Sequence, residues 1–204
     1  MNTIPTVFVV DDDPAVREAL TLLLEQEDIH VESFESAEVF LAACRSVPCS
    51  CAILDIRMPG MDGIQLQAEL TKRGNPLPII FLTSYGDIPS SVHAIKAGAV
   101  DFLTKPITGA LLLESVKEAL RESERLNSQA AENLTAAARV STLTEREHEV
   151  MVLAVKGLPN KEIARHLGIS HRTVEIHKAR IMRKTGAETL LDLARIANAC
   201  GIVA

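Results

Sequence analysis

The segment from Ala52 to Gly60 is an apolar run that reaches a single carboxylate, Asp55, and is then broken by Pro59. An apolar run of this length predicts a buried β-strand, and the Pro-Gly pair predicts a tight turn directly after it. Asp55 would then lie at the carboxyl end of a buried strand. Because ligands bind at that edge of an open α/β sheet, the segment predicts a carboxylate with a chemical role.

Strand-like and helix-like segments alternate over the first 120 residues. Short apolar runs predict strands at 7–10, 31–34, 51–54, 78–82 and 102–103. Helical spacing of apolar residues predicts helices over 14–24, 37–44, 64–70, 89–97 and 112–120, with Ser36 capping the second. Parallel neighbours need crossover connections, so this alternation predicts an α/β fold with a five-stranded, doubly wound parallel sheet.

Charge separates the 204-residue chain into two parts. Residues 1–120 hold 8 Lys/Arg and 17 Asp/Glu, a net charge of −9, whereas residues 142–204 hold 10 and 7, a net charge of +3. Residues 121–141 are neutral, contain no Pro or Gly and favour helix, first as an extension of the fifth helix to about Leu126 and then as a looser connector. We therefore expect a domain over 1–122, a helical linker over 123–141 and a basic domain over 142–204 that is a candidate for nucleic-acid binding. A coiled coil in the linker is a weaker alternative, because its apolar pattern is thin.

The composition points away from secretion and membrane insertion. No apolar run reaches the ~18 residues of a membrane span, and Met1–Pro5 lacks the basic start and apolar stretch of a signal peptide. The four cysteines show no zinc-ligand spacing and are expected as reduced thiols. A cytoplasmic protein without a membrane partner is the expected class.

Five side chains suited to metal binding or phosphoryl chemistry follow four of the predicted strands. Asp11 and Asp12 follow the first, Asp55 the third, Thr83 the fourth and Lys105 the fifth. The strand ends of a parallel sheet share one edge, so these side chains are expected in one crevice, whereas Asp13 is expected to cap the first helix. Clustered carboxylates either raise a pKa or bind a hard cation such as Mg²⁺. A carboxylate can also attack phosphorus, with Lys105 neutralising the phosphoryl group and Thr83 hydrogen-bonding to it.

Four motifs of this half resemble the receiver domain of bacterial response regulators, over about residues 5–122. They are Val-Val-Asp-Asp-Asp-Pro at 9–14, Asp-Ile-Arg-Met-Pro-Gly-Met-Asp-Gly at 55–63, Leu-Thr-Ser at 82–84 and Phe-Leu-Thr-Lys-Pro at 102–106. The resemblance implies a flavodoxin-like sheet. It also implies that Asp55 accepts a phosphoryl group from a phospho-histidine on a sensor histidine kinase.

The resemblance further implies roles for the neighbours of Asp55. Thr83 would be the switch hydroxyl, and Phe102 would stand where the family has a rotating aromatic ring. The side chains of Arg57 and Tyr85, each two residues past a motif residue, would influence the lifetime of the phosphate. Mg²⁺ would be held directly by Asp12, Asp55 and the backbone carbonyl of Arg57, and through water by Asp11.

The loop Tyr85–Pro89 resembles the Gly-Asp-x-Pro loop of the FixJ branch of this family. We expect it to move when Thr83 bonds the phosphate, with an ordinary strand–helix loop as the alternative. In that branch, phosphorylated receivers dimerise through the fourth helix and the fifth strand. Lys96 and Asp101 flank this surface and are expected to pair across a homodimer, with a solvated surface charge as the alternative for each.

The basic half has the spacing of a helix-turn-helix in a small all-α domain. Thr144 and Glu147 form a capping box, and Thr189 begins a fourth helix. Gly168-Ile169-Ser170 is a three-residue turn between the second and third helices. Asn160 and Ser170 are placed to cap those two helices.

The third of these helices is expected to bind DNA. Val174, His177 and Ile181 share one face, which we assign to the core, so His177 is expected to be a packing residue. The opposite face carries arginines, which bond phosphates or guanine, and apolar groups, which touch a thymine methyl. The residues expected at the DNA are Arg172, Thr173, Glu175, Ile176, Lys178, Ala179, Arg180 and Arg183.

Residues 142–202 resemble the LuxR-type DNA-binding domain. The motifs are Leu-Thr-Glu-Arg-Glu at 143–147, Gly-Leu-Pro-Asn-Lys-Glu-Ile-Ala at 157–164 and Ile-Ser-x-Arg-Thr-Val at 169–174. Glu175 is a departure, because several relatives have Lys there. A carboxylate does not bond phosphate, but it accepts from cytosine or orients a neighbouring arginine.

Together the two halves predict a response regulator of the FixJ/NarL type rather than an enzyme. Phosphorylation would shift Thr83 and Phe102, promote dimerisation and present two recognition helices to paired half-sites in double-stranded DNA. Activation of transcription with RNA polymerase is the expected output, and repression stays open. One alternative is a phosphorylation-independent DNA-binding protein with a vestigial receiver, which the intact acidic set disfavours. The other is a Mg²⁺-dependent aspartyl-phosphate phosphatase, which would need a second Asp where Arg57 stands.

Overall fold

In the computed structural model, which describes residues 4–45, 47–84 and 95–202, the chain divides into two units, Met1–Asn127 and Ser128–Ala204. The first unit confirms the predicted α/β class, with a five-stranded parallel sheet in the order β2-β1-β3-β4-β5. Its strands are β1 (Thr6–Val10), β2 (His30–Phe34), β3 (Ser50–Leu54), β4 (Ile79–Thr83) and β5 (Asp101–Thr104). Its helices are α1 (Pro14–Glu25), α2 (Ala37–Ala43), α3 (Gly63–Lys72) and the beginning of α5 (Gly109–Val140).

The strand order determines where on the sheet a binding crevice is expected. β1 lies between β2 and β3, so the chain changes direction across the sheet at the β1–β3 pair, and such a switch point opens a crevice at the carboxyl ends of the strands. Asp11 and Asp12 directly follow β1, and Asp55 directly follows β3. The backbone N–H of Asp55 donates to the carbonyl of Val10 at 2.9 Å, which holds the two strand ends together.

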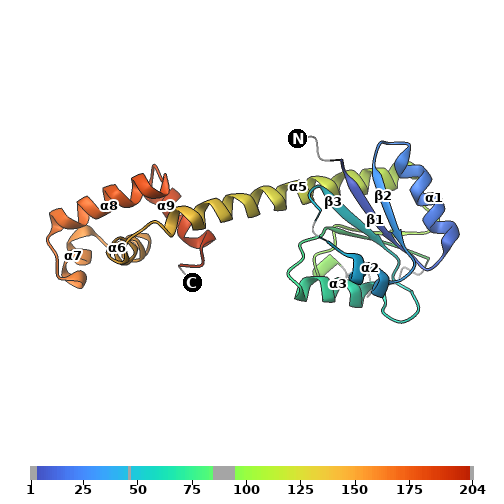
Figure 1. The fold of residues 1–204 in the computed structure, drawn as a ribbon, viewed down its shortest axis with the longest axis horizontal. Coiled ribbons are helices and arrows are strands. Elements are labelled where there is room, and N and C mark those ends of the chain that lie inside the picture. The colour runs from blue at the N-terminus through green and yellow to red at the C-terminus, as the bar shows by residue number, and fades with distance from the viewer. Residues whose placement is uncertain (1–3, 46, 85–94, 203–204) are drawn as a thin grey trace. The chain divides into compact units, whose positions relative to one another are not determined.

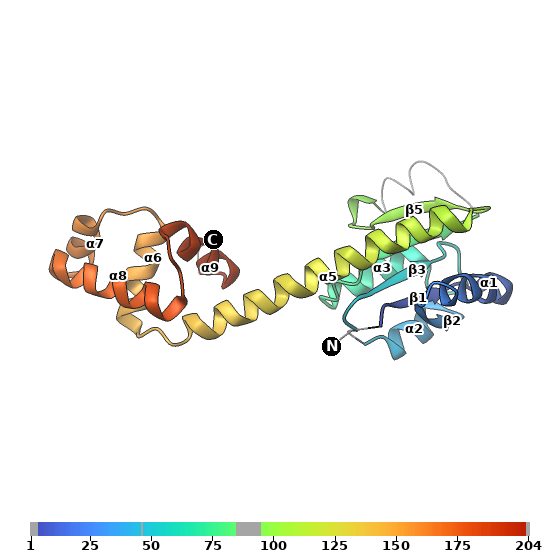
Figure 2. The same cartoon turned by 90° about the horizontal axis from the view of Figure 1, so that it is seen from above.

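Helices cover both faces of the sheet, and alternate strand residues point to opposite faces. Figures 1 and 2 show α1 and α5 on one face and α2 and α3 on the other. Val7 and Val9 pack in the core on the first side, whereas Phe8 and Val10 pack in the core on the second. The central strands are therefore buried on both faces, which fixes their register and the positions of their ends.

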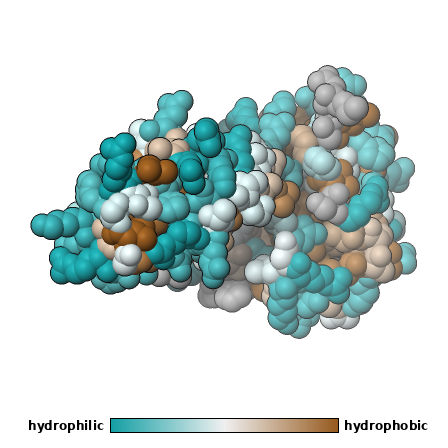
Figure 3. Space-filling view, turned by 60° about the vertical axis from the view of Figure 1, so that its left-hand side comes forward, coloured by the Kyte–Doolittle hydropathy of each residue, from teal (hydrophilic) through white to brown (hydrophobic). Residues whose placement is uncertain are grey.

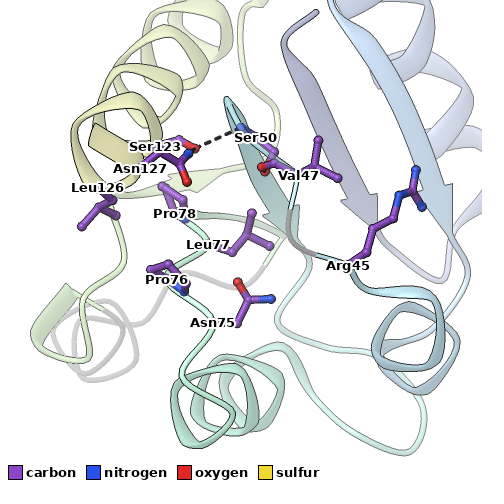
Figure 4. Close-up of a pocket in the computed structure, with 10 residues that line it drawn as sticks. All are labelled: Arg45, Val47, Ser50, Asn75, Pro76, Leu77, Pro78, Ser123, Leu126 and Asn127. Carbon is purple, nitrogen blue, oxygen red and sulfur yellow. Dashed lines mark hydrogen bonds between the residues drawn. The ribbon is translucent and has the colours of Figure 1, made fainter. Parts of the chain in front are cut away.

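The amino end of β3 is tied to α5. The backbone N–H of Ser50 donates to the buried hydroxyl of Ser123 at 3.0 Å, beside a small pocket that opens between β3, the segment before β4, and α5 (Figure 4). The Cys49 thiol donates to Glu124 Oε1 at 3.5 Å next to it. β3 thus has Asp55 after its carboxyl end and a polar contact with α5 at its amino end.

Two expectations about helices differ from the structure or fall outside it. α5 runs without a break to Val140, so the stretch beyond Leu126 is helical as expected but is not the looser helical connector predicted there. Neither Gly nor Pro interrupts this alanine-rich stretch, which has high helix propensity. The predicted helix over 89–97 lies largely outside the described residues, which show only Ile95 and Lys96 as helical. The predicted domain borders after residues 122 and 141 stay a prediction.

None of the helices in the described ranges combines the length and hydropathy that a membrane crossing needs.

The second unit contains the end of α5 and four further helices, as predicted for the all-α half. They are α6 (Glu145–Val155), α7 (Asn160–Leu167), α8 (His171–Thr185) and α9 (Leu190–Ala199). The caps expected from Ser36, Thr144 and Ser170 are confirmed. Thr189, expected as the start of the fourth helix, lies at the capping position of α9, which begins at Leu190. The cap expected from Asn160 is wrong: Pro159 occupies the capping position, and the Asn160 side chain instead accepts a hydrogen bond from Lys178 at 3.0 Å.

An ion pair between a buried glutamate and a partly exposed lysine joins α6 to α8 in this unit. Glu147, whose side chain is 3% exposed, accepts from Lys184 Nζ at 2.6 Å and from the backbone N–H of Thr144 at 2.9 Å. The hydrogen bond from Lys184 and then that from Thr144 lower the pKa of Glu147 to about 2. The pair fixes the start of α6 against the last turn of α8.

We predict that Glu147→Gln lowers the free energy of unfolding by about 2–3 kcal/mol near neutral pH, because Lys184 loses its charged partner. Glu147 titrates near 2 when folded and near 4.5 when unfolded, so its contribution is complete above pH 4.5 and is lost as the pH falls from 4.5 toward 2. The difference from the unsubstituted chain should shrink over that window. Urea unfolding followed by circular dichroism at several pH values measures it.

The matched control is Glu145→Gln, which changes an exposed glutamate in the same first turn of α6. This variant should unfold like the unsubstituted chain across the pH range. A stability loss in Glu147→Gln that stays constant down to pH 2 would contradict the assigned ion pair.

Candidate functional sites

Three carboxylates lie together at the carboxyl edge of the sheet. One oxygen from each of Asp11, Asp12 and Asp55 lies within 4.8 Å of the other two. Asp11 and Asp55 are buried, whereas Asp12 is exposed. The sequence predicted this cluster from the strand ends, and the adjacency of β1 and β3 produces it.

Both oxygens of Asp11 already have partners. Its Oδ2 accepts from Lys105 Nζ at 2.6 Å, and its Oδ1 accepts from the backbone N–H of Asp13 at 2.9 Å. Asp13 in turn caps α1 by accepting from the N–H of Ala15, as predicted. Lys105 thus comes from the end of β5 to the acidic cluster and offsets part of its charge.

Asp55 is the carboxylate with unmet hydrogen-bonding capacity. Its Oδ1 is buried and makes no hydrogen bond within the described part of the chain. Burial raises the pKa of Asp55, and the charge of Asp11 adds to this, while the Lys105 cation and a hydrogen bond with Thr83 act in the opposite direction. A buried carboxyl oxygen with no partner in the described residues, next to two further carboxylates, is a position that a hard cation would stabilise.

The turn after Asp55 has close backbone packing. A Cβ atom added at Gly63 would lie 2.2 Å from the Asp55 carbonyl oxygen, so only glycine allows α3 to begin there. Asp62 caps α3 in a capping box with Gln65. The side chain of Arg57 is exposed on this turn. The Asp-to-Gly motif at 55–63 therefore describes a loop whose start, cap and first helical residue are all fixed.

The residues expected at a dimer surface lie in different environments. Lys96 is exposed, whereas Asp101 is half-buried and accepts from the Ser115 hydroxyl at 2.5 Å and from the Phe102 N–H at 2.7 Å. The Phe102 ring is half-buried, with its centroid 6.3 Å from that of Phe81. Asp101 is therefore engaged within its own unit rather than standing as a solvated charge. Tyr85 and the loop to Pro89 lie outside the described residues.

The predicted recognition helix is α8. Figure 3 shows that the second unit presents a mostly hydrophilic surface with small hydrophobic spots. Ile176, 45% exposed, is a large apolar side chain on this helix that faces solvent, and half-buried His177 lies on the core side. The expected DNA residues that are exposed are Arg172, Glu175, Ile176, Ala179, Arg180 and Arg183.

Two of the expected DNA residues are less accessible. Thr173 is half-buried and its N–H donates to the capping hydroxyl of Ser170 at 3.0 Å. Lys178 is half-buried and donates to Asn160 at the start of α7. Glu175, the departure in the motif, lies 3.6 Å from the imidazole of His171 one turn earlier. Glu175 therefore has His171 as a nearby partner on the exposed surface of α8.

Sequence reasoning missed several contacts that shape these sites. Arg17 of α1 donates to the backbone carbonyl of Asp11 at 2.6 Å, and Glu38 of α2 accepts from the N–H of Met61 at 2.9 Å. Lys184, in the last turn of α8, pairs with Glu147. Glu38 and Lys184 have no signal in local spacing, since each pairs with a residue that only folding brings near. The Arg17 contact spans six positions, which is longer than the three or four of a pair on one helix face.

Two family models match the chain and together cover most of it. The model described as the response regulator receiver domain matches residues 7–117, and the model described as bacterial regulatory proteins of the luxR family matches residues 141–197. The first lies on the unit with the acidic cluster, and the second covers α6 to α8 and most of α9.

Several relatives match this chain over most of their own length. The chain is 39% identical over 203 residues to the transcriptional regulatory protein FixJ of Bradyrhizobium diazoefficiens, covering 100% of this chain and 99% of FixJ. It is 41% identical over 190 residues to the response regulator protein TodT of Pseudomonas putida, covering 93% and 84%. Among solved structures, the response regulator StyR matches with a TM-score of 0.74 at 42% identity, covering 96% of this chain and 98% of that one. Full-length FixJ from B. japonicum matches with a TM-score of 0.59 at 39% identity over 100% of both chains.

We predict that Gly63→Ala destabilises the first unit by about 2–3 kcal/mol, because the new Cβ overlaps the Asp55 carbonyl and forces the backbone to move. Chemical unfolding followed by circular dichroism measures this loss. Gly109→Ala is the matched control, since its Cβ would meet only the end of the Leu23 side chain at 3.0 Å. Equal stability of the two variants would contradict the assigned close approach.

Proposed function

We propose a phosphorylation-controlled role for this chain, which belongs to the DNA-binding two-component response regulators of the FixJ type. Asp55 would accept a phosphoryl group from a phospho-histidine on a sensor histidine kinase. Phosphorylated chains would form homodimers that bind double-stranded DNA and activate transcription with RNA polymerase. The observation that carries the proposal is a buried Asp55 with an unpartnered oxygen in the described structure, beside Asp11 and Asp12.

The proposed transfer is a displacement at phosphorus. An Asp55 oxygen attacks, the bond from phosphorus to the donor imidazole nitrogen breaks, and its electron pair stays on the histidine. The carboxylate must be ionised to attack, and the Lys105 cation favours that form against the effect of burial. Lys105, which donates a hydrogen bond to Asp11 in this structure, would also neutralise negative charge on the phosphoryl oxygens. The Thr83 hydroxyl would donate a hydrogen bond to an oxygen of the phosphoryl group.

The residues of this edge fit a Mg²⁺ ion. Asp12, Asp55 and the Arg57 carbonyl would hold it directly, which gives the few hard oxygen ligands that Mg²⁺ takes from proteins. Asp11 would act through water, because both its oxygens already accept hydrogen bonds. When bound, the ion supplies positive charge that offsets the transferred phosphoryl oxygens.

The proposed switch and dimer surface involve residues beside the acidic edge. Movement of Thr83 toward the phosphate would open space for the half-buried Phe102 ring to turn. Lys96 and Asp101 would then pair across a homodimer. Because Ser115 already holds Asp101, that pair would have to share or replace an existing hydrogen bond.

The second unit would read DNA through the exposed side of α8. Arg172, Arg180 and Arg183 would bond phosphates or guanine, and Ile176 with Ala179 would contact a thymine methyl. Thr173 and Lys178 would contribute from the edge of this surface. Glu175, oriented by His171, would accept from the amino group of a cytosine.

We predict that beryllofluoride with Mg²⁺, which mimics the aspartyl-phosphate, converts the chain from monomer to dimer. Asp55→Asn should stay monomeric under the same conditions, because the amide does not take up the phosphoryl mimic. Sedimentation velocity of both proteins measures the change. Asp13→Asn is the matched control, since asparagine also caps a helix and this residue lies outside the acidic trio.

A dimer shift in Asp55→Asn would contradict the assignment of Asp55. If the unsubstituted chain gave no shift, the dimerisation part of the proposal would be wrong. DNA binding measured under the same conditions then shows whether Asp55 still controls affinity in the monomer.

We predict that Arg172→Ala weakens binding to a selected DNA duplex about tenfold, because one contact in the groove is lost. Fluorescence anisotropy on a duplex selected from random sequence measures the affinity. Arg195→Ala, which removes an exposed arginine from α9, is the control for net charge and should bind nearly as well as the unsubstituted chain. Equal losses in the two variants would show that α8 is not the reading helix.

A further inference from the structure

The loop after Asp55 is anchored at its two ends. The Asp55 N–H donates to the Val10 carbonyl at 2.9 Å, and the Gly63 N–H donates to the Ile56 carbonyl at 3.0 Å. The side chains of Ile56 and Met58 are buried between these anchors. Pro59 and Gly60 at the tip are exposed, so packing alone does not fix this part of the loop.

Glu38, in the first turn of α2, supplies a contact at the tip. Its Oε1 accepts from the backbone N–H of Met61 at 2.9 Å, although the two residues are 23 positions apart. The same oxygen lies 2.7 Å from the place where a Cβ of residue 60 would stand, so the carboxylate rests directly over Gly60. Gly60 also has a φ of +78°, which favours glycine. A side chain at position 60 would therefore displace Glu38 from Met61.

The hydrogen bond from the Met61 N–H to Glu38 has a charged acceptor. Hydrogen bonds from its own backbone N–H and from that of Met61 hold the pKa of Glu38 below its usual range, so the side chain is a carboxylate at neutral pH. Hydrogen bonds to an ionised acceptor are about twice as strong as those between neutral groups. The bond links α2 to the one loop that carries both Asp55 and the Arg57 carbonyl.

We infer that Glu38 is a positioning residue for the phosphoacceptor site, because its hydrogen bond to Met61 fixes the loop that presents the Arg57 carbonyl. The inference rests on the proposed function, which assigns that carbonyl to Mg²⁺. Glu38 touches no reacting atom and acts through the backbone. Mg²⁺ demands near-ideal octahedral geometry, so a carbonyl on a loosened loop binds it less well.

The test uses the full chain with three substitutions. Glu38→Ala removes the acceptor, Glu38→Gln keeps an acceptor oxygen without the charge, and Glu35→Ala removes a neighbouring exposed glutamate that precedes α2. Two quantities are measured: hydrogen exchange of the Met61 amide by NMR without Mg²⁺, and the dissociation constant of Mg²⁺ by calorimetry. Thermal unfolding checks that each variant is folded.

We expect Glu38→Ala to speed exchange at the Met61 amide about tenfold and to raise the Mg²⁺ dissociation constant about tenfold. Glu38→Gln should fall between the two, within about threefold of the unsubstituted chain in both quantities, because the amide oxygen still accepts the hydrogen bond but lacks the charge that strengthens it. Glu35→Ala should change neither. A merely structural role would move the unfolding temperature without separating Glu38→Gln from Glu38→Ala in Mg²⁺ affinity.

Two results would overturn the inference while leaving the proposed function intact. One is an unchanged Mg²⁺ dissociation constant in Glu38→Ala. The other is an equal loss in Glu38→Gln and Glu38→Ala, which would make the charge rather than the hydrogen bond responsible. If the unsubstituted chain itself bound no Mg²⁺, the proposed function would fail and the inference with it.

Discussion

Repulsion between three carboxylates at one sheet edge is the constraint around which the first unit is arranged. Asp11, Asp12 and Asp55 offer oxygens within 4.8 Å of one another, an arrangement that is unfavourable without compensation. Lys105 and the backbone N–H of Asp13 stabilise Asp11, but Asp55 keeps a buried oxygen without a partner in the described structure and a raised pKa. A fold that retains such a local conflict departs from the usual agreement between sequence and stability, and departures of this kind occur at functional sites.

The rest of this unit keeps the three carboxylates close together despite their repulsion. β1 and β3 are buried on both faces, so neither strand can slide to separate Asp11 from Asp55 without exposing its core residues. Two helices each make a hydrogen bond to a loop at this edge. Arg17 of α1 donates to the Asp11 carbonyl, and Glu38 of α2 accepts from the Met61 N–H. The strands therefore determine where the carboxylates lie, while the helices determine how the connecting loops are oriented.

The sequence predicted what depends on local spacing or on strand ends. The acidic trio and Lys105 follow from the rule that parallel strands share an edge, and the caps at Ser36, Thr144 and Ser170 follow from contacts within four residues. Asn160 fits the same local rule and was predicted wrongly: it is the first residue of α7 with Pro159 at the capping position, and its side chain accepts from Lys178, 18 positions away. The Glu38–Met61 contact and the Glu147–Lys184 pair were missed because their residues lie 23 and 37 positions apart in the sequence. Contacts between elements depend on packing, which the one-dimensional pattern does not contain.

Charge places a condition on how the proposed activation would work. Residues 1–120 carry a net charge of −9, and a phosphoryl group would add about −1.5 to −2. DNA is itself a dense line of negative charge, so this addition opposes binding as far as long-range electrostatics is concerned. A gain in DNA affinity on phosphorylation therefore has to come from geometry rather than from charge. Joining two chains makes the second recognition helix bind in an intramolecular step, and the resulting effective concentration raises affinity without any new contact to DNA. Dimerisation is thus the part of the proposed mechanism that must outweigh the electrostatic cost of the phosphate.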